Sequence, residues 1–178
     1  MTFGVLAEVA IWFVSYFSHD TLEGMFRLSA VLSGRLSAII FLIAFYLFAT
    51  SQQAELKDNK PARQFINLFA LVHIIHFGFL AGNVYLNSVE LEIPRIAGGA
   101  LAYLMIVAAP LYLHNLGRKF QLVYFYYVSF VMIMTYINRA QGEFQGSEPS
   151  WFHYVMIAVF LACCAVFGWQ LRRKWTHS

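Results

Sequence analysis

The sequence contains little charge. Only 12% of its 178 residues are Asp, Glu, Lys or Arg, whereas 60% are hydrophobic. Soluble domains have roughly 25% charged residues, so the composition excludes an ordinary soluble enzyme. Several apolar runs approach the length at which a helix crosses a bilayer. The sequence therefore predicts an all-α, polytopic membrane helix bundle in a lipid bilayer, with six transmembrane helices, or five if the short first run does not cross.

Cysteines and basic clusters are also scarce. The two cysteines, Cys163 and Cys164, are adjacent, and a disulfide between neighbours is strained, so we interpret both as small hydrophobic side chains. No basic stripe indicates a nucleic-acid surface, so nucleic acid is not an expected partner. The apolar runs leave no residues for a soluble catalytic domain. If the protein carries out redox chemistry, its flavin or nucleotide must therefore belong to another chain.

The apolar runs define the expected spans. In one transmembrane domain over residues 1–178, they lie at about residues 2–17, 28–50, 65–86, 96–113, 120–137 and 151–171. Glu8 interrupts the first run, and we expect it either to face inward with a hydrogen bond or to lie near the head groups. Arg35, inside the second span, is expected to snorkel or to pair. The polar segment 51–63 contains Pro61 and is predicted to be a loop.

Charges in alternate loops predict the orientation. One side of the membrane receives most of the basic residues, Lys57, Lys60, Arg63, Arg118, Lys119, Arg172, Arg173 and Lys174. The other side receives three arginines, Arg27, Arg95 and Arg139. It also receives six acidic residues, Asp20, Glu23, Glu90, Glu92, Glu143 and Glu148. Because cytoplasmic loops are enriched in Lys and Arg, the first side is predicted to be the cytoplasm. Both termini are then cytoplasmic.

The third apolar run, residues 65–86, carries His73 and His76 near its middle. At about 1.5 Å per residue, a helix that enters near Arg63 reaches His73 after roughly 15 Å, close to the midplane of a hydrocarbon core about 30 Å thick. Ring nitrogens at that depth need a hydrogen-bond partner, a cavity, or a metal or cofactor, so the pair is predicted to be a functional site. Both rings share one helix face. They are expected to face the same neighbour and cannot hold a flat ligand from both sides.

Five stretches of the chain resemble one known family. They are residues 34–48 (GRLSAIIFLIAFYLF), 70–80 (ALVHIIHFGFL), 96–109 (IAGGALAYLMIVAA), 116–119 (LGRK) and 126–140. Their order and spacing resemble the bacterial ferric-reductase-like transmembrane proteins, a group that includes the haem-binding membrane subunit of the periplasmic methionine sulfoxide reductase system. The resemblance implies a haem b between the third and fifth spans and electron transfer in the bacterial inner membrane, as one component of an oxidoreductase. Its implied partners are a cytoplasmic flavoprotein or a quinol as donor, and other membrane subunits.

The resemblance also implies which residues would hold the haem. His73 and His76 match the histidine-bearing third span of the family. The fifth span departs from the family pattern: Gln121 stands where members commonly have a histidine, and Met134 lies near the position of a second one. Three arrangements stay open: a His/Met pair on the iron, a five-coordinate haem on His73 or His76, or loss of haem. Without haem, both rings would hydrogen-bond to neighbours such as Ser129, Thr135 or Tyr127.

One further histidine, His114, follows the fourth span. A cation is favoured at that helix end, and the alternatives are a ligand to a second haem or a contact to a propionate together with Arg118 and Lys119. Two classes of function remain. The chain is either a haem b protein that passes electrons across or within the membrane, or a non-catalytic accessory subunit of a larger complex that has lost haem.

Overall fold

The protein is an all-helical bundle. The computed structural model describes residues 1–51, 56–90, 93–143 and 149–175. Over these residues the chain forms six α-helices, α1 (Thr2–Ser18), α2 (Leu22–Thr50), α3 (Lys60–Leu86), α4 (Ile93–Tyr112), α5 (Arg118–Ala140) and α6 (Trp151–Trp175), and two short 3₁₀ turns, η1 (Leu56–Asp58) and η2 (Leu113–Asn115). Five helices are long and apolar enough to cross a membrane, and α1 is a shorter apolar helix. The predicted polytopic bundle is confirmed.

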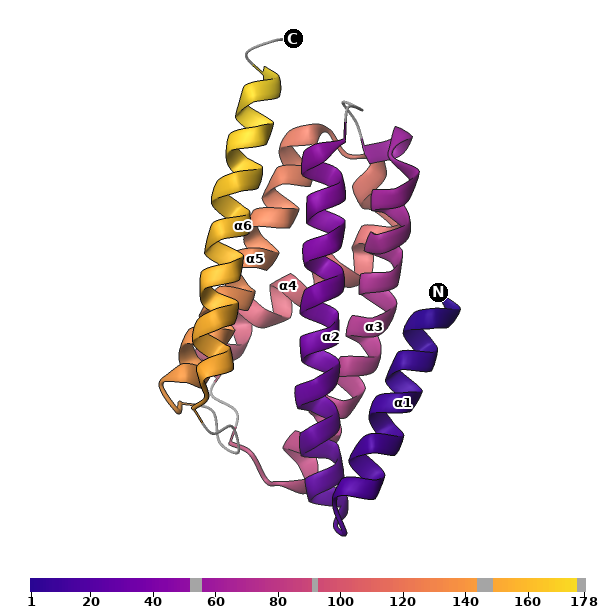
Figure 1. Cartoon of the computed structure of the whole chain (residues 1–178), viewed down its shortest axis with the longest axis vertical. Coiled ribbons are helices and arrows are strands. Elements are labelled where there is room, and N and C mark those ends of the chain that lie inside the picture. The colour runs from indigo at the N-terminus through magenta and orange to yellow at the C-terminus, as the bar shows by residue number, and fades with distance from the viewer. Residues whose placement is uncertain (52–55, 91–92, 144–148, 176–178) are drawn as a thin grey trace.

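The helices are arranged as a ring. α2 packs against α3, α3 against α4, α4 against α5, α5 against α6, and α6 returns to α2. α1 lies outside this ring and covers the side formed by α2 and α3 (Figure 1). α2 therefore packs against α1, α3 and α6, and its aromatic rings also reach Phe125 of α5.

Connections alternate between the two ends of the bundle (Figure 1). We call one end the basic end because the described turns and helix ends there carry Lys57, Lys60, Arg63, Arg118, Lys119, Arg172 and Arg173. We call the other the acidic end because it carries Asp20, Glu23, Glu90 and Glu143, together with Arg27 and Arg139. Glu92 and Glu148, which the charge pattern also assigned to that end, lie outside the described residues. The alternation of charge follows the sequence prediction.

The helices α2 to α5 begin earlier than predicted, and for α2 and α3 the reason is that capping residues precede their apolar runs. The Thr21 side chain accepts a hydrogen bond from the Gly24 amide, and α2 begins at Leu22. The Asn59 side chain accepts one from the Ala62 amide, and α3 begins at Lys60. The prediction of a loop through Pro61 is wrong at its end, since proline is well tolerated in the first turn of a helix.

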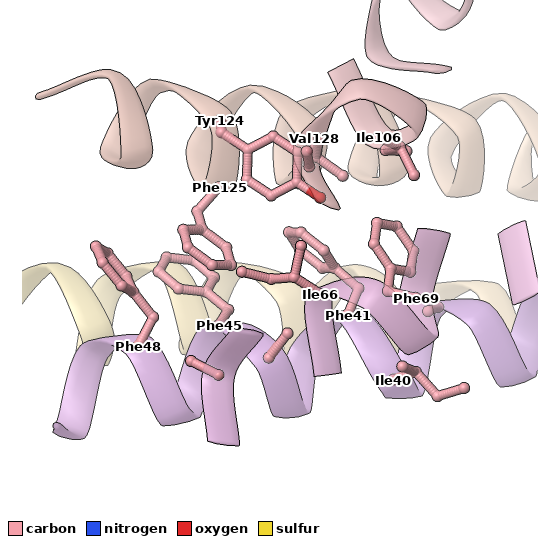
Figure 2. Packing of buried hydrophobic residues seen from close by; sticks show 14 of the residues in the cluster. Ile40, Phe41, Phe45, Phe48, Ile66, Phe69, Ile106, Tyr124, Phe125 and Val128 are labelled. Carbon is pink, nitrogen blue, oxygen red and sulfur yellow. The ribbon is translucent and has the colours of Figure 1, made fainter. Parts of the chain in front are cut away.

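The ring of helices encloses a core of aromatic side chains. Phe41 and Phe45 of α2, Phe69 of α3, Phe125 of α5 and Phe160 of α6 are completely buried. Figure 2 shows rings from α2 and α3 packed against those of α5, and the Phe45 and Phe125 rings stack with centroids 4.9 Å apart. Helices in lipid associate largely through such close contact. This aromatic core fills the half of the bundle nearer the basic end.

The stability of the bundle should depend strongly on Phe41. Its ring contacts rings on three other helices, with centroid distances of 5.1 Å to Phe69, 6.0 Å to Phe125 and 6.3 Å to Phe160. Phe41→Ala should lower the free energy of unfolding by about 3 kcal/mol. This is the lower end of the range for such truncations, because lipid also solvates the Phe41 ring when the bundle is unfolded. Phe130 is 58% exposed, and Phe130→Ala should cost no more than about 0.5 kcal/mol. Unfolding in mixed micelles measures both, and equal losses would contradict the prediction.

The face of α1 that packs against the bundle is a narrow stripe of small and polar residues. Its buried residues are Gly4, Glu8 and Ser15. Gly4 lies against α3 so closely that a Cβ there would stand 2.5 Å from Leu68 Cδ1. The opposite face exposes large apolar side chains, as a lipid environment favours, among them Phe3, Leu6, Phe13 and Phe17. Burial of Glu8 confirms the inward-facing, hydrogen-bonded alternative for this residue.

Candidate functional site

The candidate site is built around the two histidines of α3. His73 lies thirteen residues after the start of α3 at Lys60, so it is about 20 Å along the helix. Its Nδ1 is 2.8 Å from the Ser37 hydroxyl oxygen on α2. The His76 ring lies over Gly34 of α2. A Cβ at Gly34 would stand 2.9 Å from His76 Cε1. Both rings face α2, which confirms that they share one neighbour.

Aromatic rings surround the histidine pair. The His73 and His76 rings have centroids 5.5 Å apart. The His73 ring lies 5.2 Å from the Phe69 ring on the side of the aromatic core and 5.8 Å from the Tyr103 ring of α4. Tyr103 in turn packs on Phe77 at 4.5 Å. The pair therefore stands at the boundary between the aromatic core and the half of the bundle nearer the acidic end.

The contact with Ser37 determines what the His73 ring can do. If Nδ1 carries the proton, it donates to the Ser37 oxygen, and Nε2 keeps its lone pair for a metal. Metal-binding histidines usually have such a partner on the other nitrogen, because it fixes the tautomer and the ring orientation. His76 differs, since its Nδ1 is buried and has no hydrogen-bond partner among the described residues. His73 is therefore the better oriented candidate ligand.

A row of buried hydroxyls on α2 leads to this site. Ser29, Ser33 and Ser37 are four residues apart, so they lie on one face of the helix, and at most 1% of each is exposed. Ser33 donates a 2.7 Å hydrogen bond to Glu8 Oε1. The sequence analysis did not identify these serines. Their four-residue spacing in an otherwise apolar span was the signal that could have found them.

The other predicted ligands lie elsewhere. Gln121, in the first turn of α5, is buried at the basic end and donates to the Leu116 carbonyl oxygen at 2.8 Å. His114 lies in η2, at the same end. Met134 has a depth similar to that of the histidines, but it is 40% exposed, on the face of α5 that also exposes Val123 and Phe130. The structure therefore brings none of these three side chains to the histidine pair.

Two arginines lie in the half of the bundle nearer the acidic end. The Arg35 guanidinium stands 4.1 Å from the centre of the Phe152 ring on α6, so its partner is an aromatic face. Arg139, near the end of α5, is close enough to His76 and to Arg35 for electrostatic interaction. The histidine pair therefore has an aromatic wall on one side and positive charge on the other.

The side chains that could act as metal ligands limit which cofactor this site could hold. In the part of the chain that the structure describes, no three His, Cys, Asp or Glu side chains gather as a metal site. A haem iron requires only one imidazole from the protein, and His73, oriented by Ser37, fits that role. His76 comes from the same helix face and cannot occupy the opposite side. The described residues therefore offer a haem one oriented imidazole, that of His73.

Comparisons of the chain with protein-family models, with curated proteins and with solved structures found no match. The similarity to ferric-reductase-like proteins therefore stays a prediction. The geometry of the site itself carries the functional interpretation.

Proposed function

We propose that the protein is a membrane-embedded haem b protein that passes electrons across or within the membrane as one component of an oxidoreductase. The observation that carries the proposal is the 2.8 Å contact between His73 Nδ1 and the Ser37 hydroxyl, which leaves Nε2 available. A haem bound there would supply one-electron redox chemistry. The residues of the chain would contribute the axial imidazole, its orientation and a dry aromatic wall.

The contributions of individual residues follow from their places. His73 would hold the iron through Nε2, and Ser37 would hold the ring in the tautomer that leaves this nitrogen free. Phe69 and Tyr103, which flank the His73 ring, exclude water from one side. Because Met134 faces outward, it would not hold a haem bound at His73. Of the two arrangements that include haem, this supports the one in which a single histidine of the chain would hold the iron.

The proposal includes a donor and an orientation. The helices leave no soluble domain among the described residues, so a flavoprotein or a quinol must supply the electrons. The basic end faces the cytoplasm of a bacterial inner membrane, by the enrichment of Lys and Arg in cytoplasmic segments. With this orientation His73 lies near the membrane midplane, which places it within reach of donors on either side.

An absorption spectrum of the purified protein tests the proposal. We expect a Soret band, α and β bands after reduction, stoichiometric haem by extraction, and high-spin features because one axial position lacks a protein ligand. The same spectrum and haem content are expected for protein from cells supplied with a haem precursor and for protein incubated with haemin. Colourless preparations under both conditions would overturn the proposal and support a non-catalytic accessory subunit.

A further inference from the structure

The helix α1 is attached to the ring of helices by a single hydrogen bond. Ser33 of α2 donates it to Glu8 Oε1 at 2.7 Å, and no other hydrogen bond joins α1 to the ring in the part of the chain that the structure describes. The other two serines of α1, Ser15 and Ser18, donate to carbonyl oxygens of α1 itself. The position of α1 therefore depends strongly on the contact between Glu8 and Ser33.

The apolar contacts of α1 discriminate weakly between a docked and a separated helix. The Trp12 ring stacks on Phe79 of α3 with centroids 5.8 Å apart, and it meets the Phe26 ring of α2 edge to face at 5.3 Å. Lipid tails are as apolar as these rings, so lipid can replace the partners that Trp12 would lose. Glu8 is thus the side chain of α1 whose surroundings differ most between the two positions.

The docked position requires a protonated Glu8. The side chain is 2% exposed, and an ionised carboxylate taken out of water costs several kcal/mol unless a cation pairs with it. The hydrogen-bond partner of Glu8 is the neutral hydroxyl of Ser33, so docked Glu8 is the carboxylic acid. Oε2 then carries the proton, and it has no hydrogen-bond partner among the described residues. Docking is therefore favourable only for the protonated side chain, and it leaves one polar atom unsatisfied.

The length and the attachment of α1 give it a second position. It has 17 residues and is about 25 Å long, less than the hydrocarbon core of about 30 Å. It joins α2 at the acidic end through residues 19–21 and lies against the bundle from there (Figure 1). Glu8 lies ten residues, about 15 Å, before the last residue of α1, Ser18. If α1 tilts into the membrane surface about this joint, its stripe of Gly4, Glu8 and Ser15 meets water while its large apolar side chains stay in lipid.

Other titratable groups on the neighbouring helices do not explain a dependence of α1 on pH. The titratable and charged residues of α2 are Glu23, Arg27, Arg35 and Tyr46, and those of α3 are Lys60, Arg63, His73, His76 and Tyr85. None of their described interactions is with Glu8, since Arg27 bonds to Asn87, Arg35 lies over a ring of α6, and the histidine pair faces α2. Glu8 is therefore the group whose protonation distinguishes the two positions.

We propose that α1 is a proton-dependent cover on the α2–α3 face of the bundle, docked while Glu8 is protonated and turned to the membrane surface when Glu8 ionises. Separation breaks the Oε2–H bond, the proton passes to water at the surface, and no electrons move. Docking binds one proton, so falling pH favours the docked position and rising pH the separated one. The face that separation uncovers adjoins the candidate site, because Ser33 precedes Gly34, over which the His76 ring lies. This inference does not depend on the proposed haem function.

Fluorine NMR of Trp12 tests the two positions. The full chain, labelled with fluorotryptophan, is placed in lipid nanodiscs, the Trp12 signal is assigned with Trp12→Phe, and spectra are recorded from about pH 5 to about pH 10. We expect the signal of Trp12 stacked on Phe79 to be replaced by a second signal as the pH rises. A gadolinium chelate dissolved in the water should broaden the second signal more than the first, because the separated helix lies at the surface. The tryptophans of α6 report whether the rest of the bundle keeps its fold.

Four variants identify the group responsible. Glu8→Gln is neutral and keeps an oxygen for Ser33, so it should stay docked over the whole pH range. Ser33→Ala should lower the midpoint of the transition by about half to one pH unit, which corresponds to one lost hydrogen bond. Glu23→Gln and His19→Gln, near the joint, are matched controls and should keep the midpoint. A Trp12 signal that does not change with pH in the unsubstituted protein would overturn the proposal, as would a normal transition in Glu8→Gln or an unchanged midpoint in Ser33→Ala.

Discussion

Replacing His73 by alanine is expected to remove nearly all haem from the purified protein. Among the described residues, His73 is the ring of the pair whose Nδ1 has a partner, the Ser37 hydroxyl at 2.8 Å, so its Nε2 is the better oriented candidate ligand. The measurement is Soret absorbance per chain together with extracted haem. Ser37→Ala keeps the imidazole but removes the hydrogen-bond partner of its Nδ1, and should weaken haem affinity by about 10- to 100-fold, as is typical when such a partner of a metal ligand is lost.

Two variants separate a ligand effect from a loss of fold. His153 is buried on α6, its Nδ1 accepts a hydrogen bond from the Ser150 amide and its ring packs near Tyr136, so His153→Ala should retain haem. His76→Ala should retain haem with an altered spectrum, because its ring lies beside that of His73. If His73→Ala, His76→Ala and the double variant all keep the haem content of the unsubstituted protein, neither ring is a ligand.

A leucine at Gly34 is expected to disrupt the site from the opposite helix. Even a Cβ at Gly34 would stand 2.9 Å from His76 Cε1, so a larger side chain must displace the imidazole or separate α2 from α3. Such overpacking typically costs about 1–3 kcal/mol of unfolding free energy. We expect Gly34→Leu to lose that stability and to lower haem content, both measurable on one preparation.

Gly78 provides the control for that substitution. It lies on α3, and a Cβ there would meet nothing within 4 Å. Gly78→Leu also replaces a helical glycine in an apolar span, so it has the same effects on helix propensity and hydrophobicity. It should be stable and retain haem. If Gly34→Leu behaves like Gly78→Leu, α2 does not press on His76 and the described packing of the site is wrong.

The architecture was largely predictable because it is determined by local properties of the sequence. Length and hydropathy of the apolar runs predicted the helices, and the spacing of His73 and His76 predicted that both rings face one neighbour. The largest displacements are at the starts of α2 and α3, since Thr21 and Asn59 cap helices that begin before the apolar runs. Each of these features depends on residues within a few turns of one another.

The composition of the site was less predictable because it depends on which helices pair. The resemblance implied a partner for α3 on α5, but the hydrogen bond to His73 comes from Ser37 of α2. Met134 has the predicted depth, yet its face of α5 is exposed. α5 is apolar over much of its circumference, so hydrophobic periodicity does not distinguish the face toward lipid from the face toward the core.

The ring of helices has a consequence for biogenesis. α6 closes it through Phe160 against Phe41 and Phe167 against Phe45, which join the last helix to the second. Among the helices of the ring, a ribosome delivers α2 and α3 first, and these neighbours can pair at once. The face of α2 that packs against α6 then meets acyl chains until the final helix emerges. Chains stalled at that stage should be the species that membrane proteases recognise.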